Sequence, residues 1–74
     1  MKTMTEKDKL RALLPHWIEH NAEHAADFSL WAGRAGEAGT DIEAAAAQME
    51  AVNDALAAAL AKLGGPLEDH DHHH

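Results

Sequence analysis

Apolar residues recur at intervals of three and four positions along two stretches of the chain, a spacing that favours amphipathic helices. The first stretch contains Leu10, Leu13, Leu14, Trp17, Ile18, Phe28 and Trp31. The second contains Ile42, Met49, Leu56 and Leu63, with Ala45, Val52 and Leu60 between them. These stripes predict one helix over residues 5–33 and another over residues 41–63.

Two local signals refine the first helix. Thr5 followed by Asp8 is a capping pattern that predicts a start near Thr5. Pro15 lacks an N–H group and clashes with the carbonyl four residues earlier, so the helix either kinks there or stops and restarts. Because the apolar stripe keeps its phase across Pro15, we favour a kinked, continuous helix.

Glycines mark the ends of the second helix. Three of them fall within residues 33–39 and predict a loop over residues 34–40. Thr40 and Glu43 then predict a capping box with Thr40 as N-cap. The sequence Gly64-Gly65-Pro66 ends the helix. Residues 1–66 are therefore expected to form an all-α antiparallel helical hairpin, followed by a flexible His-rich tail at 67–74.

A hairpin of this size buries little apolar surface, since the whole chain has 74 residues. Trp17, Phe28 and Trp31 are large for the partial burial that one hairpin offers. The Ala-rich second helix allows close approach of another helix. These features predict a homodimer that forms a four-helix bundle; the alternative is a lone hairpin.

Composition argues against several functional classes. The formal net charge is -7, and four of the six basic residues lie between Lys2 and Arg11. No basic stripe with interleaved aromatic residues is present, so nucleic acid and anionic membrane are not expected as partners. The charged N-terminus lacks the apolar core of a signal peptide, which predicts a cytoplasmic protein. The chain has no cysteine, so any metal site must use imidazole and carboxylate ligands.

The most informative polar residues are His16, His20 and His24, which are spaced four apart. Residues at this spacing stack along one ridge of a helix, where two imidazoles can share one metal ion. Glu23 lies beside the ridge and offers a carboxylate ligand. Imidazole ligands suit Zn(II), Ni(II) or Cu(II).

Equal rise along two antiparallel helices predicts which residues face each other. Asn21 is expected opposite Asn53 or Asp54, and an Asn21–Asn53 hydrogen bond would fix the register. His24 is expected opposite Glu50 or Ala51. We therefore predict a metal site of His20, His24 and Glu50, with His16 as a peripheral ligand.

The leading functional hypothesis is a carrier, buffer or sensor of a transition metal ion, acting with a metal-handling partner protein. A second is a non-catalytic, homodimeric protein-protein interaction module in which the histidines are structural. A third is a haem-binding bundle with His24 of each hairpin as an axial ligand. No nucleophile or substrate pocket is evident, so an enzyme is not expected.

The C-terminus is a second His-rich feature, with side chains suited to loose binding of Ni, Cu or Zn at His70, His72, His73 and His74. Leu67-Glu68 followed by histidines also resembles the remnant of an affinity tag. Asp69 and Asp71 interrupt the usual tag pattern, so both origins stay open.

The segment Leu14-Pro15-His16-Trp17-Ile18-Glu19-His20-Asn21-x-x-His24, followed by Phe28 and Trp31, resembles a family of small, functionally unassigned bacterial helical proteins and domains. The resemblance implies that the histidine segment is a signature of that family. It implies no activity and no catalytic residue.

Overall fold

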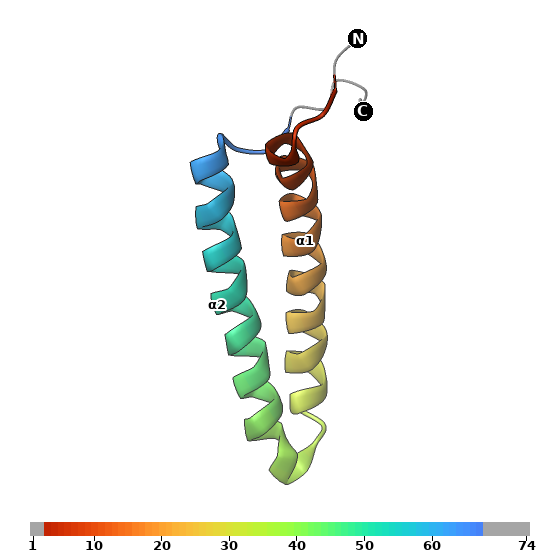
Figure 1. The fold of residues 1–74 in the computed structure, drawn as a ribbon. Helices are drawn as coiled ribbons and strands as arrows, with labels where there is room; N and C mark the ends of the chain where they lie inside the picture. The colour runs from red at the N-terminus through yellow and green to blue at the C-terminus, as the bar shows by residue number, and fades with distance from the viewer. Residues whose placement is uncertain (1–2, 68–74) are drawn as a thin grey trace.

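The computed structural model describes residues 3–67 and contains two long antiparallel helices (Figure 1). Helix α1 spans Glu6–Ala32 and helix α2 spans Gly39–Leu63, with the 3-10 turn η1 at Gly36–Ala38 between them. The predicted all-α hairpin is therefore confirmed. The molecule measures 56 × 27 × 15 Å, so it is a single layer of helices. Neither helix of the described part is both long enough and apolar enough to cross a membrane.

The two helices meet along a seam whose residues alternate at three and four positions, as in a coiled coil. On α1 the seam contains the partly or fully buried residues Arg11, Leu14, Ile18, Asn21, Ala25, Phe28 and Ala32. On α2 they are Gly39, Ile42, Ala46, Met49, Asn53, Leu56, Leu60 and Leu63. The most deeply buried apolar residues described are Leu14, Ala25 and Ala46. Two of these are alanines, so in the middle of the seam the backbones of α1 and α2 lie close together with only small side chains between them.

A pair of asparagines lies at the centre of the seam. The side-chain amide of Asn21 donates a hydrogen bond to Asn53 Oδ1 at 3.0 Å. The Asn53 amide donates in turn to the backbone carbonyl of Ile18 at 2.9 Å. The predicted Asn21–Asn53 bond is confirmed, and it selects one register for the two helices.

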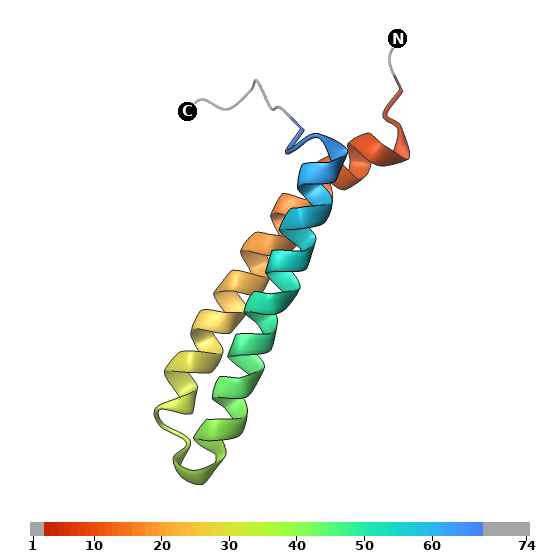
Figure 2. The ribbon, with the colours of Figure 1, turned by 90° about the vertical axis from the view of Figure 1, so that its left-hand side faces the viewer.

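Helix α1 continues through Pro15. Because Pro15 has no N–H group, it cannot bond to the carbonyl of Arg11. The Leu67 N–H, beyond the end of α2, donates to that carbonyl at 3.3 Å. The Arg11 side chain also donates to the carbonyls of Gly65 and Pro66, at 2.7 and 3.3 Å. The gap made by Pro15 thus serves as a docking point for the chain that leaves α2. Figure 2 shows the first turns of α1 leaning away from the axis of the rest of the helix.

The outer ends of both helices carry the expected caps. At the start of α1, Thr5 Oγ1 accepts from the Asp8 N–H at 3.0 Å, while the Thr5 N–H donates to the Asp8 carboxylate. This is the reciprocal capping box that the sequence predicted. Helix α2 ends at Gly64, whose φ of 108° is left-handed, and the Gly65 N–H bonds back to the Leu60 carbonyl at 2.9 Å.

The predicted capping box at the start of α2 is wrong. Thr40 lies inside α2, because η1 leads directly into the helix at Gly39, and the N-cap is Ala38 without a side-chain bond. Gly39 packs against the carbonyl of Ala32, where a Cβ atom would clash. Because Gly39 has no side chain, α2 can begin there, against α1, one residue before the predicted N-cap Thr40. Glu43 accepts a bond from Ser29 of α1 at 3.1 Å instead of reaching back to Thr40.

We expect Asn53→Ala to lower the free energy of unfolding by about 1–3 kcal/mol, because it leaves the half-buried Asn21 amide without its acceptor. Urea unfolding followed by circular dichroism, at fixed protein concentration, measures the change. The control is Asp54→Ala, an exposed neighbour for which a change within about 0.5 kcal/mol is expected. Equal unfolding midpoints for the two variants would contradict the role of the asparagine pair.

We expect Pro15→Ala to release the segment after α2, because the new N–H group competes with Leu67 for the Arg11 carbonyl. Amide hydrogen exchange at Leu67, followed by nuclear magnetic resonance, should become faster in this variant. The control is Pro66→Ala, which replaces the chain's other proline and leaves the Arg11 carbonyl free for Leu67. Unchanged Leu67 exchange in Pro15→Ala would show that the docking has another cause.

Candidate functional site

The histidines that the sequence singles out lie on the outer surface of α1, and His16, His20 and His24 are all exposed. The rings of His16 and His20 are neighbours, with centroids 4.4 Å apart and planes inclined at 65°. The unbroken helix through Pro15 sets this contact, since residues four apart lie one turn above each other. His16 and His20 are therefore the two histidines that the structure brings together.

His24 has a different neighbour. Its ring stacks on Phe28, with centroids 6.2 Å apart and planes inclined at 27°. Phe28 belongs to the seam, so this contact holds His24 on the flank of α1 beside the seam. His24 therefore packs on Phe28 and is not part of the His16–His20 pair.

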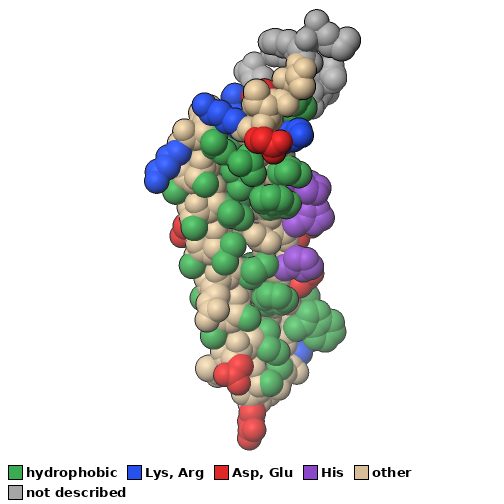
Figure 3. All heavy atoms as spheres, viewed as in Figure 1, with side chains coloured by type: hydrophobic (Ala, Val, Ile, Leu, Met, Phe, Trp, Pro, Cys, Tyr) green, Lys and Arg blue, Asp and Glu red, His purple; other side chains and the backbone are tan. Residues whose placement is uncertain are grey.

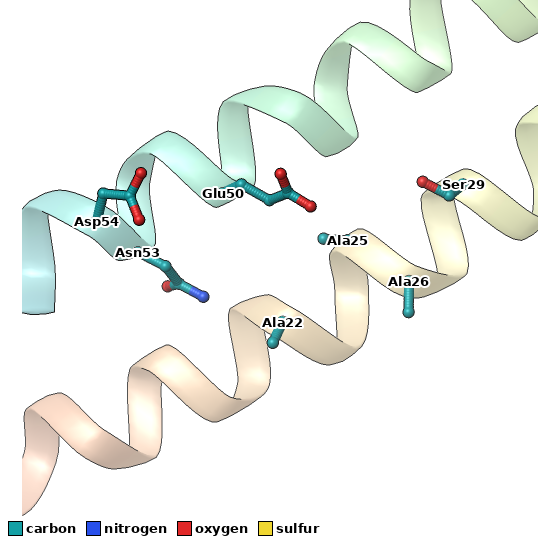
Figure 4. Close-up of a pocket in the computed structure, with 7 residues that line it drawn as sticks. All are labelled: Ala22, Ala25, Ala26, Ser29, Glu50, Asn53 and Asp54. Atoms are coloured by element: carbon teal, nitrogen blue, oxygen red, sulfur yellow. The ribbon is translucent and has the colours of Figure 1, made fainter.

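Glu50 lies on the other flank. It lines an open hollow of about 380 Å³ together with Ala22, Ala25, Ala26, Ser29, Asn53 and Asp54 (Figure 4). The small alanines of α1 leave this space, and the hydrogen bond from Ser29 to Glu43 lies along the same flank. We call Glu43, Glu50 and Asp54 the acidic flank.

The predicted ligand set of His20, His24 and Glu50 is thus not assembled in the structure. Two residues at the same level along the helix axes can lie on opposite sides of the seam. Glu50 lies on the side away from His24. Glu23 is exposed on α1, one turn from His20. Within residues 3–67, no three His, Asp or Glu side chains are grouped so that they could hold a metal ion. His70, His72, His73 and His74 lie outside the described residues.

The flank of the seam opposite the acidic flank is apolar. On α1, Leu10, Trp17, His24 and Trp31 follow one another at intervals of seven, with Leu13 beside them. On α2, the matching flank carries Ala45, Val52 and Ala59. We call these eight residues the aromatic face. Figure 3 shows hydrophobic side chains of both helices on the face turned to the viewer, with histidines along its edge.

The aromatic face is open to solvent. Trp31 is 57% exposed, Val52 45% and Trp17 42%, large fractions for apolar side chains. It contains no Asp, Glu, Lys or Arg, although Arg34 lies over the Trp31 ring at 5.0 Å. From the sequence, both tryptophans were expected to be too large for burial within one hairpin, and their exposure agrees with that. On a helical wheel, Trp17 and Trp31 lie to one side of Leu14 and Ile18, and this offset is the signal that could have separated the aromatic face from the seam.

Comparison with known proteins places the chain in a family. The model of a domain of unknown function (DUF8180) matches residues 10–63, well over half of the chain. The chain belongs to this family. No curated protein and no solved structure matches it.

The region matched by the DUF8180 model runs from Leu10, the first residue of the aromatic face, to Leu63, the last residue of α2. It therefore includes the asparagine pair, the His16–His20 pair and both flanks of the seam. The resemblance to functionally unassigned small helical proteins agrees with this family, whose description assigns no activity.

Proposed function

We propose that this protein is a non-catalytic interaction module whose aromatic face pairs with the same face of a second copy, giving a symmetric four-helix bundle. The observation that carries the proposal is the aromatic face itself, a largely apolar surface formed by both helices with two half-exposed tryptophans. Exposed apolar patches of this kind mark association sites in soluble proteins.

The surface area supports a partner that covers a whole side of the hairpin. The chain exposes 5587 Å². A compact monomer of 8.0 kDa exposes about 4,450 Å². The chain thus exposes about 1,100 Å² more than a compact protein of its mass, as expected for an elongated hairpin. A standard protein interface buries roughly 800 Å² on each partner. The hairpin is a single layer of helices 15 Å thick, whereas most domains pack two layers around a core. A partner on the aromatic face would supply the second layer.

The symmetry of the aromatic face favours a second copy as that partner. Leu10, Trp17, His24 and Trp31 are evenly spaced along α1. A two-fold axis at the height of His24 places Trp17 of one copy against Trp31 of the other, so the same patch complements itself. Indole rings supply much of the burial energy in interfaces of this type.

The distribution of charge supports the same choice. The chain carries a net charge of -7, so two copies repel each other unless the acidic residues are kept away from the contact. Glu43, Glu50 and Asp54 all lie on the acidic flank, across the seam from the aromatic face. The contact we propose therefore avoids these three carboxylates.

A charge placed in the aromatic face tests the proposal. Sedimentation velocity over a range of concentrations should give the parent chain a mass of twice 8.0 kDa. We expect Val52→Glu to weaken the dimer roughly tenfold or more, because Val52 lies at the height of His24 and two carboxylates would meet near the two-fold axis.

The matched control is Ala58→Glu, which adds the same carboxylate to an exposed position on the outer side of α2. It should leave the mass unchanged. Trp17 and Trp31 give a second readout, since their fluorescence should shift to shorter wavelength as the dimer forms. A parent chain that stays monomeric, or two variants that dissociate equally, would refute the proposal.

A further inference from the structure

We propose that His16 and His20 form a two-imidazole site for a divalent transition metal ion on the outer surface of α1. This inference goes beyond the self-association proposed above and does not depend on it. It also replaces the predicted set of His20, His24 and Glu50, which the structure does not bring together.

The ring geometry suits chelation of one ion. Nitrogen ligands lie about 2.0–2.1 Å from Zn(II), which places the ring centres of two neighbouring ligands on one ion about 4.5–5 Å apart. The His16 and His20 centroids are 4.4 Å apart, just below that spacing. Small side-chain rotations open the pair to the required separation, while the backbone of α1 stays as it is.

Both rings are available to a ligand. His16 and His20 are exposed, and no hydrogen bond or salt bridge within residues 3–67 involves either of them. A metal ion therefore displaces water, not a protein partner. His24 differs, because stacking on Phe28 draws its ring toward the seam.

The local charge favours a cation. Glu19 and Glu23 follow His16 and His20 by three positions each, so each carboxylate lies one turn from an imidazole. The order His16-x-x-Glu19-His20 is also the H-x-x-E-H spacing in which one class of zinc enzymes presents two histidine ligands on a helix. Here the pair is on an open surface, so water completes the coordination and the site binds rather than reacts.

The identity of the ligands sets the preference among ions. Imidazole suits Cu(II), Ni(II) and Zn(II), whereas Mg(II) and Ca(II) require oxygen ligands. We expect Cu(II) to bind more tightly than Zn(II), and Mg(II) to give no response. Acidification should release the ion, because imidazole binds a metal only after it has lost its proton.

Isothermal titration with Zn(II) and Cu(II) tests the site in the full-length chain with His70, His72, His73 and His74 replaced by glutamine, which removes tail ligands. We expect His16→Gln and His20→Gln each to weaken binding roughly tenfold or more, since each leaves a single imidazole. The matched controls His24→Gln and Glu50→Gln should bind as tightly as the parent. With Zn(II), the ring resonances of His16 and His20 should shift and those of His24 should not.

Three results would overturn the proposal: no binding by the parent, unchanged binding by the His16→Gln variant, or a loss in His24→Gln equal to that in His20→Gln. The last would assign the ion to the other pair of histidines four apart. The Val52→Glu variant separates this site from the dimer. It should bind metal as the parent does, whatever its mass.

Discussion

The hydrogen bond between Asn21 and Asn53 is the constraint on which the rest of the structure depends. The middle of the seam is built from Ala25 and Ala46, whose small side chains would allow one helix to slide along the other at little cost. The asparagine pair penalises such slippage, because a shifted register leaves polar groups half-buried without partners. At the outer end of the seam, Arg11 reinforces the same register through the carbonyls of Gly65 and Pro66.

Once the register is set, the two flanks of the seam acquire different chemistry. One collects the carboxylates of the acidic flank, and the other collects the tryptophans of the aromatic face. The His16–His20 pair lies outside both, on the outer surface of α1. The surface that we propose for a second hairpin and the pair that we propose for a metal ion therefore share no side chain.

The sequence predicted the two helices, the Thr5 cap and the Asn21–Asn53 contact, because these depend on periodicity, local hydrogen bonding and helical rise. It did not predict the position of Glu50. Helical rise determines the height of a residue along the seam, whereas the flank depends on how the helices are rotated about their axes. The sequence placed Trp17 and Trp31 in one broad apolar stripe with the seam residues, because two adjacent faces of a helix share the same period. The start of α2 was mispredicted because it depends on the close approach of Gly39 to Ala32. This is a tertiary contact, which a local sequence motif does not predict.

The docking of Leu67 on the carbonyl that Pro15 leaves vacant has a mechanical consequence. The segments that enter α1 and leave α2 lie at the same end of the hairpin, far from η1 (Figure 1). A pulling force applied through both segments therefore acts on the Arg11 and Leu67 hydrogen bonds first. The seam would then separate turn by turn toward Gly39, so the asparagine pair would break before the Ser29–Glu43 hydrogen bond that lies nearer the turn.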